Sequence, residues 1–189
     1  MKNVKLSILA LIALTGLNSC NNDDDATIVN PEEVITTLTA TFEPVAGGET
    51  VVLTSRDLDG DGPEAPIISV LGNFTTGASY SGTVSFLNET ETPAENVSEE
   101  ILTEGDEHQI FFQQDDLGTF TYTDADVNQR PIGLTFSFVA STTPQTGLLT
   151  ITLRHEPNKA AAGVADGDIT NAGGESEAMA TFEVSVVAP

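Results

Sequence analysis

The sequence contains few of the residues on which several common functions depend. It has one cysteine, no tryptophan, two tyrosines and six basic residues against 29 acidic ones in a chain of 189 residues. A single cysteine excludes an internal disulfide, so the folded part must be stabilised by its hydrophobic core. The shortage of lysine and arginine excludes nucleic acid as a partner, because phosphate groups are bound by clustered basic side chains.

Catalytic motifs are also missing. The sequence has no Gly-x-Ser-x-Gly turn, no phosphate-binding glycine loop and no zinc-protease helix motif. Paired carboxylates for glycoside hydrolysis are available among so many acids. The few aromatic residues, however, leave a poor platform for stacking sugars. We therefore expect a non-enzymatic protein and keep a hydrolase as a distant alternative.

The first 19 residues have the organisation of a secretory signal peptide. Two lysines within the first five residues precede an apolar run over 6–17, which is shorter than the roughly 20 residues that span a bilayer. The stretch Leu17-Asn18-Ser19-Cys20 resembles the lipobox of bacterial lipoproteins, although Asn18 replaces the small residue usual there. This resemblance implies cleavage before Cys20 and acylation of Cys20. The alternative is a plain secretion signal with a chance cysteine.

Residues 20–33 are predicted to form the lipidated cysteine and an acidic tether. The stretch Asn21-Asn22-Asp23-Asp24-Asp25 resembles the acidic tract of surface-exposed lipoproteins of the Bacteroidetes. A tether of this length reaches about 40 Å when extended, and two or three acyl chains anchor a protein firmly. We therefore expect a protein that is lipid-anchored in the outer membrane and faces the cell exterior.

Loss of the signal peptide removes two lysines and changes the formal net charge from −23 to −25. Such a charge favours a divalent cation or a basic protein surface as the binding partner.

Residues 34–189 have the pattern of an all-β domain. Apolar residues alternate with polar ones, and glycine, proline, asparagine and aspartate separate the runs. One short helix over 96–105 is predicted from a capping pair, Asn96 and Glu99, and a terminal Gly105. About nine strands favour an antiparallel two-sheet sandwich of immunoglobulin or fibronectin-III type, with a jelly roll as the alternative. The strands are expected over 34–42, 49–56, 66–71, 79–86, 108–114, 118–123, 134–138, 149–153 and 178–186.

Two segments near the C-terminus resemble a family of small, largely uncharacterised lipoproteins of the Bacteroidetes. They are Leu153-Arg154-His155-Glu156-Pro157-Asn158-Lys159 and the stretch over 167–175. Some members carry a label that invokes the type 1 periplasmic-binding fold superfamily. That fold alternates strands with helices, which this sequence does not do. The resemblance therefore implies that the protein is a lipoprotein, and it implies little about what the protein does.

The long connections are expected at one end of the sandwich. With nine alternating strands, the connections after the second, fourth, sixth and eighth strands meet at the same end. They carry well over half of the 29 acidic residues, and long loops on a rigid scaffold are common binding sites. These connections are residues 57–65, 88–107, 124–131 and 156–176.

The first of these connections resembles half of a calcium loop. Asp57-Leu58-Asp59-Gly60-Asp61-Gly62 offers carboxylates at alternate positions around a glycine. Ile68 stands where an EF-hand has its bidentate glutamate, so Glu64 or another loop would have to supply that ligand. The alternative is an ordinary Asp-Gly turn.

The only two histidines are also expected at this end. His108 begins one strand and His155 ends another, and each has a carboxylate neighbour, Glu107 and Glu156. Two imidazoles with a carboxylate can bind zinc, copper or iron. The alternative is a pair of polar caps on the core.

Together these observations predict a surface lipoprotein that binds a cation, a small ligand or a protein. It would act as an accessory to an outer-membrane uptake receptor, and a TonB-dependent receptor is the expected partner class. A structural or adhesive module without a defined ligand is the alternative.

Overall fold

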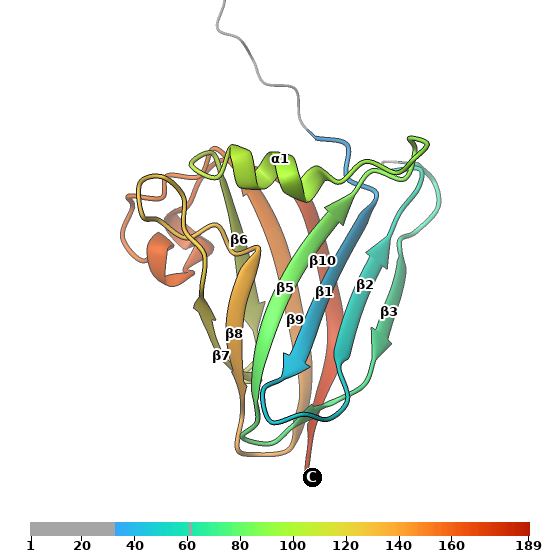
Figure 1. Cartoon of the computed structure of the whole chain (residues 1–189), viewed down its shortest axis with the longest axis vertical. Coiled ribbons are helices and arrows are strands. Elements are labelled where there is room, and N and C mark those ends of the chain that lie inside the picture. The colour runs from blue at the N-terminus through green and yellow to red at the C-terminus, as the bar shows by residue number, and fades with distance from the viewer. Residues whose placement is uncertain (1–32, 61) are drawn as a thin grey trace, which may run out of the picture. The chain divides into compact units, whose positions relative to one another are not determined.

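Ten strands form two sheets that pack face to face (Figure 1). The computed structural model describes residues 33–60 and 62–189, so Cys20, the acidic tether and Asp61 lie outside the described residues. The predicted all-β two-sheet sandwich is confirmed. The first sheet has the order β3-β2-β1-β5-β8-β7, and the second has the order β4-β10-β9-β6. The strands are β1 (Thr37–Pro44), β2 (Val51–Arg56), β3 (Ile67–Leu71), β4 (Phe74–Thr75), β5 (Ser79–Leu87), β6 (His108–Gln114), β7 (Gly118–Tyr122), β8 (Thr135–Ala140), β9 (Gln145–His155) and β10 (Glu175–Val187).

The strand order agrees with an immunoglobulin-like topology. In such domains strands A, B, E and D form one sheet and C, F and G form the other. Here β1, β5, β8 and β7 occupy the first set of positions, and β6, β9 and β10 occupy the second. Two strands, β2 and β3, extend the first sheet beyond β1. The short β4 pairs in parallel only with the last residues of β10.

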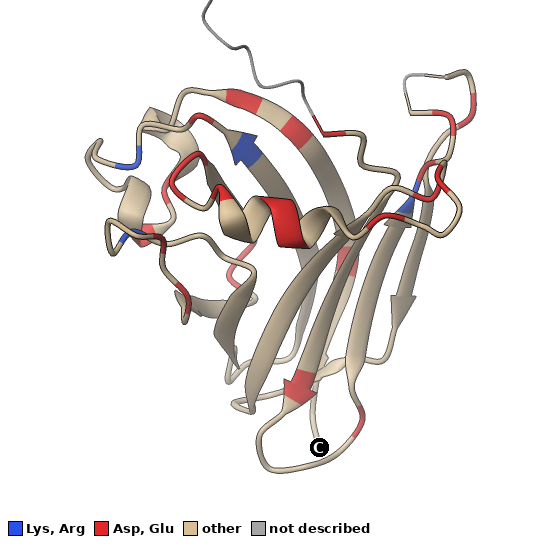
Figure 2. Ribbon diagram, turned by 45° about the horizontal axis from the view of Figure 1, so that its top comes forward, with Lys and Arg blue, Asp and Glu red and all other residues tan. Residues whose placement is uncertain are grey.

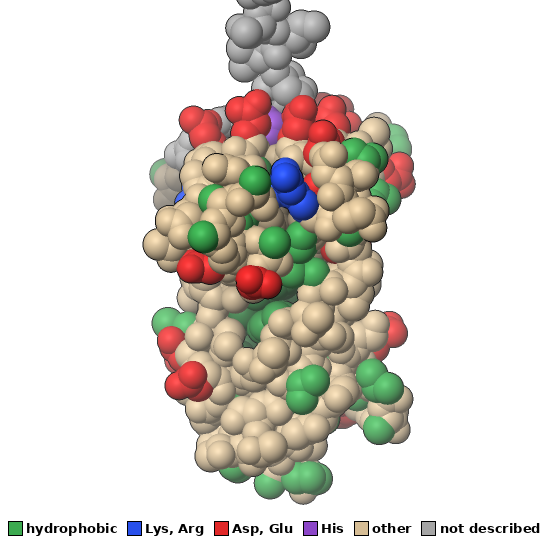
Figure 3. Space-filling model, turned by 90° about the vertical axis from the view of Figure 1, so that its left-hand side faces the viewer, with side chains coloured by type: hydrophobic (Ala, Val, Ile, Leu, Met, Phe, Trp, Pro, Cys, Tyr) green, Lys and Arg blue, Asp and Glu red, His purple; other side chains and the backbone are tan. Residues whose placement is uncertain are grey.

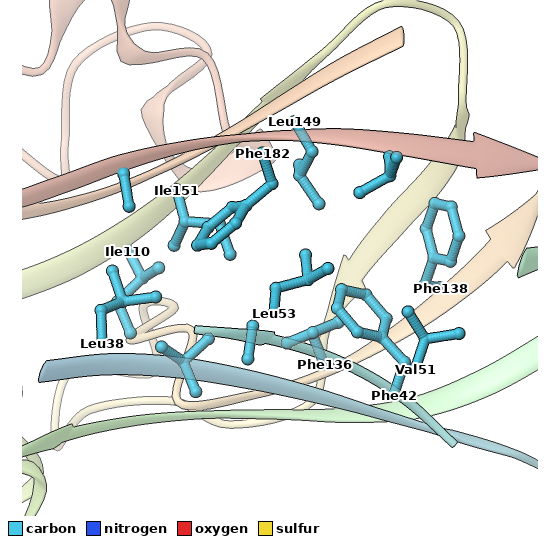
Figure 4. Packing of buried hydrophobic residues seen from close by; sticks show 14 of the residues in the cluster. Leu38, Phe42, Val51, Leu53, Ile110, Phe136, Phe138, Leu149, Ile151 and Phe182 are labelled. Atoms are coloured by element: carbon cyan, nitrogen blue, oxygen red, sulfur yellow. The ribbon is translucent and has the colours of Figure 1, made fainter. Parts of the chain in front are cut away.

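Alternation along the strands builds the core between the sheets (Figure 4). Phe42 of β1 lies at its centre, and its ring centroid is 4.9 Å from Phe74, 5.2 Å from Phe136 and 5.7 Å from Phe138. All three contacts are edge-to-face, a geometry worth about 0.5–1.5 kcal/mol per pair beyond burial. The core lies wholly within residues 33–189, which belong to one compact unit.

Several strand boundaries differ from the prediction, among them those of β9, which spans Gln145–His155 rather than 149–153, and β10, which begins at Glu175. The first strand begins at Thr37 rather than at residue 34, because the preceding residues run across the end of the sandwich and leave Val34 58% exposed. The two-residue β4 was not predicted, since two residues show no periodicity. Gly72, with a φ of +82°, ends β3 and lets the chain cross toward the second sheet.

The predicted helix exists as α1 (Val97–Thr103) but is capped differently. The side chain of Asn96 makes no hydrogen bond to the helix backbone, and its amide instead donates to Glu99 Oε1 at 2.9 Å. Glu104, not Gly105, is the C-terminal cap. No helix among the described residues is long and apolar enough to cross a membrane.

Four connections gather at one end of the sandwich, which we call the acidic pole (Figure 2). Acidic side chains crowd the same end in the side view of Figure 3. The extra strand β4 does not disturb this sorting, because it runs in the same direction as β3 (Figure 1). The connections are residues 57–66, 88–107, 123–134 and 156–174.

A buried ion pair links three of these connections. Lys159 Nζ lies 3.0 Å from Asp126 Oδ2 and also donates to the carbonyl oxygen of Gly105. Both side chains are 1% exposed. Asp126 additionally accepts the backbone N–H groups of Asn128 and Arg130 at 2.8 and 3.0 Å. The pair therefore holds the acidic pole together from inside.

Replacing Lys159 by methionine is expected to lower the free energy of unfolding by about 3–5 kcal/mol, because the buried carboxylate of Asp126 loses its counter-charge. Urea unfolding followed by circular dichroism measures this difference. Arg56→Met is the control, since Arg56 and its partner Glu89 have side chains that are 40% and 26% exposed and such pairs contribute about 1 kcal/mol at most. Equal losses for the two variants would contradict a special role for Lys159.

Candidate metal centre

Two adjacent strands of the second sheet bring both histidines together at the acidic pole. His108 begins β6 and His155 ends β9, and the two residues are direct cross-strand partners. Their rings stack with centroids 4.9 Å apart and an interplanar angle of 13°. The side chains of His108 and His155 are 0% and 11% exposed. The predicted juxtaposition of the two imidazoles is therefore present.

The carboxylate between them comes from Glu177, which the sequence analysis did not identify. Alternation from Ala178 and Ala180 would turn Glu177 away from the core. The pairing of β10 with β9 shifts its register between Ser176 and Ala178, however, and leaves Glu177 unpaired in a β-bulge. Bulges redirect side chains and are frequent beside functional sites. The side chain of Glu177 is 0% exposed as a result.

A second carboxylate arrives from the segment before β1. Glu33, with a side chain that is 4% exposed, places Oε1 3.2 Å from His108 Nε2. Glu177 Oε2 lies 3.3 Å from the same nitrogen, while Glu177 Oε1 lies 3.3 Å from His155 Nδ1. One ligand atom from each of His108, His155 and Glu177 lies within 4.8 Å of the others, and His108 forms a second such group with Glu33 and Glu104.

The contacts in this cluster are close but lack the geometry of hydrogen bonds. His108 Nε2 and all four carboxylate oxygens of Glu33 and Glu177 are buried without a hydrogen-bond partner among the described residues. The other nitrogen of His108, Nδ1, lies 3.1 Å from the carbonyl oxygen of Glu104. A proton on Nδ1 completes that bond, so Nε2 directs a lone pair at two carboxylates. Only an additional proton or a cation can make this arrangement favourable.

Three nitrogen-to-oxygen distances match the spacing between neighbouring ligands of a small tetrahedral ion. Zinc binds nitrogen and carboxylate oxygen at about 2.0–2.1 Å, which places neighbouring tetrahedral ligands about 3.3 Å apart. The nitrogen-to-oxygen distances here are 3.2 and 3.3 Å. The bond from His108 to a backbone carbonyl is also the orienting contact typical of zinc-bound histidine. Calcium fits poorly, because it takes six to eight oxygen ligands.

Burial and the charges within the cluster shift the pKa values of its side chains. Burial raises the pKa of Glu33 to about 7, and the contact with Glu177 adds to the shift. Burial opposes the charged form of His108, yet Glu177, the Glu104 carbonyl and Glu33 together raise its pKa above the ordinary value. Burial acts to raise the pKa of Glu177, but His108 and Glu33 overcome it and lower that pKa. The cluster thus holds protons near neutral pH when no metal is bound.

The two predicted carboxylate neighbours occupy different positions. Glu107 Oε2 is 3.7 Å from His155 Nε2, and its side chain is 47% exposed, so Glu107 borders the cluster from the solvent side. Glu156 is exposed and belongs to neither ligand group found among the described residues. Its backbone has a φ of +49°, and its N–H donates to the Glu107 carbonyl at 2.7 Å.

The predicted calcium loop forms a turn in its described part. Asp59 accepts the backbone N–H of Gly62 on its carbonyl at 2.9 Å and that of Glu64 on Oδ2 at 3.2 Å. Asp57, Asp59 and Glu64 belong to no group of three ligands among the described residues. Asp61 lies outside these residues, so the calcium site stays a prediction.

Comparison of the chain with protein-family models, with curated proteins and with solved structures found no match in any of the three. The resemblance to lipoproteins of the Bacteroidetes therefore stays a prediction.

The metal-free protein should lose stability as the pH rises from about 4.5 through about 7. Glu33, with a pKa of about 7 against the ordinary 4.5, keeps in the folded state a proton that the unfolded chain releases. The raised pKa of His108 also makes the stability fall as the pH rises. The lowered pKa of Glu177 changes the stability only at acidic pH. Thermal melts in chelator measure the effect, at about 2–4 °C per kcal/mol. Glu33→Gln should flatten the slope, and a melting temperature that rises with pH would contradict the assignment.

Proposed function

We propose that this protein is a non-enzymatic, lipid-anchored binding protein whose site takes a zinc-like divalent metal ion. The ligands are His108, His155 and Glu177, and Glu33 lies against His108. Glu107 lies outside this set and borders His155 from the solvent side at 3.7 Å. The ion would enter a site that carries more negative than positive charge, which favours a cation over any anionic ligand.

One observation carries the proposal: a histidine nitrogen and four carboxylate oxygens converge in a buried position without hydrogen bonds. Without a bound cation or added protons, these atoms stay unsatisfied, and each unsatisfied buried polar group costs about 1–3 kcal/mol. The β-bulge that turns Glu177 inward supports the same conclusion. Glu177 gives up its backbone pairing with β9 and places its carboxylate between the two imidazoles.

The location follows from the N-terminal sequence. A signal peptide, Cys20 and the acidic tract support an anchor in the outer membrane that faces the cell exterior. In that position a metal-binding domain would serve as an accessory to an uptake receptor, and the TonB-dependent class is the partner we propose. Metal capture outside the cell is consistent with a site that depends on histidine and carboxylate and contains no oxidisable thiol.

Zinc should raise the melting temperature of the mature chain, residues 20–189 with Cys20→Ser, by about 5–10 °C when present at about 100 times its dissociation constant. Differential scanning fluorimetry in chelator and then in zinc or calcium measures this shift. Glu177→Gln should abolish it, because the central ligand is lost. Glu107→Gln should change the zinc shift only slightly, because Glu107 is half exposed and lies 3.7 Å from His155 Nε2.

Glu156→Gln is the matched control and should keep the full zinc shift, because Glu156 is an exposed neighbour of His155 outside the ligand groups. No zinc shift in the unaltered chain would overturn the metal site and favour the structural module. A calcium shift that Asp59→Ala removes would instead place a cation in the connection between β2 and β3.

Cys20→Ser in the full-length chain should abolish incorporation of labelled fatty acid and move the protein out of the membrane fraction, because Cys20 is the only cysteine. Metabolic labelling and fractionation measure both outcomes. Protease treatment of intact cells then tests exposure at the exterior. Continued membrane association of the Cys20→Ser protein would contradict a lipid anchor.

A further inference from the structure

The sandwich is open along one side because its two sheets differ in width. The first sheet continues past β1 with β2 and β3, whereas the second sheet ends at β10 except for the two residues of β4. Only part of β10 therefore lies against β3. A groove of about 420 Å³ opens here at the acidic pole, and its walls include Leu38, Pro66 and Met179.

This partial cover leaves apolar side chains of β3 exposed to water. Ile68 and Val70 share the inward face with their partners Ser55 and Leu53, yet they are 45% and 38% exposed. On the outward face, Ile67 and Leu71 are 67% and 66% exposed. Leu58, in the connection before β3, and Met179 of β10 are also 47% and 69% exposed. Contiguous exposed apolar patches on a folded protein mark interaction surfaces.

The free edge of β3 also lacks the charged residues, prolines and bulges that usually protect an edge strand. The strand is Ile67-Ile68-Ser69-Val70-Leu71, with no charge, proline or bulge. Its backbone makes no hydrogen bond to any described residue outside β2. The edge strand β6 is covered by comparison, because Ile110 donates its N–H to the Ile132 carbonyl and its carbonyl accepts Tyr122 Oη–H, both at 2.7 Å. An unprotected apolar edge is a template for another strand.

We propose that β3 pairs with β3 of a second copy of this chain and forms a two-fold symmetric dimer. The strand is self-complementary about Ser69. In an antiparallel pair centred there, each Ile68 lies opposite the second copy's Val70, and each Ile67 lies opposite its Leu71. Both faces of the new ladder are then apolar, as an isologous interface requires. The first sheets of the two copies become one continuous sheet.

The distribution of charge favours this partner and orientation. Residues 57–66 precede β3 with several acidic side chains, while the following turn, Gly72-Asn73, is uncharged. Antiparallel pairing places each acidic connection beside the uncharged turn of the second copy and puts the two acidic poles at opposite ends. Parallel pairing would bring the two acidic connections together. Because both copies carry a large negative charge, added salt should tighten the dimer.

Sedimentation equilibrium of the mature Cys20→Ser chain, from about 1 to about 200 μM, tests the proposal. We expect a monomer–dimer equilibrium that tightens several-fold between about 0.05 and about 0.5 M NaCl. Val70→Lys should weaken dimerisation at least about tenfold, since it places a charge in the ladder. Val139→Lys is the matched control, because Val139 is 46% exposed on β8, inside the same sheet.

A cysteine at the symmetry axis gives a second readout. The Cys20→Ser chain has no other cysteine, so Ser69→Cys should form an intermolecular disulfide under mild oxidation. Directly opposite residues of an antiparallel pair have Cα atoms about 4.5–5.5 Å apart, within disulfide reach. Ser81→Cys, exposed on β5, is the control and should crosslink far more slowly. A monomer at all concentrations, a dimer unaffected by Val70→Lys, or equal crosslinking of the two cysteines would each overturn the proposal.

Discussion

The reversal of chain direction from one strand to the next determines where the polar groups of this domain lie. Each reversal sends alternate connections to alternate ends, so the long acidic connections meet at one pole. The same reversals bring the first residue of β6 and the last residue of β9 side by side, which pairs His108 with His155. The core between the sheets is then free of charge, and the ion pair of Lys159 with Asp126 stabilises the pole from within.

The pole concentrates negative charge that a folded protein has to compensate. At its surface, water and counterions screen the carboxylates. Inside, Lys159 compensates Asp126, whereas Glu33 and Glu177 face two imidazoles and no permanently charged base. Protons compensate this second pair only near and below neutral pH, as the raised pKa of Glu33 indicates. A bound divalent ion would compensate it at any higher pH, which links folding of the pole to occupancy of the site.

Much of the architecture and half of the candidate site could be predicted from the sequence. Period-two alternation identified nine of ten strands. The alternating direction of successive strands was enough to place His108 and His155 at one end. Glu177 could not be found, because the bulge between Ser176 and Ala178 reverses the face that alternation assigns to it. Glu33 was included in the tether, since its contact with His108 joins residues far apart in the sequence. Such contacts depend on tertiary packing and leave no local pattern.

The entry of the chain through Glu33 has a mechanical consequence. Glu33 lies four residues before β1, and β1 is hydrogen-bonded along its length to β2 on one side and β5 on the other. A pull on the chain at Glu33 acts along β1 and therefore across its ladder hydrogen bonds, which lie perpendicular to the strands. All of them share the load at once instead of opening one after another. A domain held by its first residues against flow at a cell surface would thus resist force through shear, with the Glu33 cluster as the first element to yield.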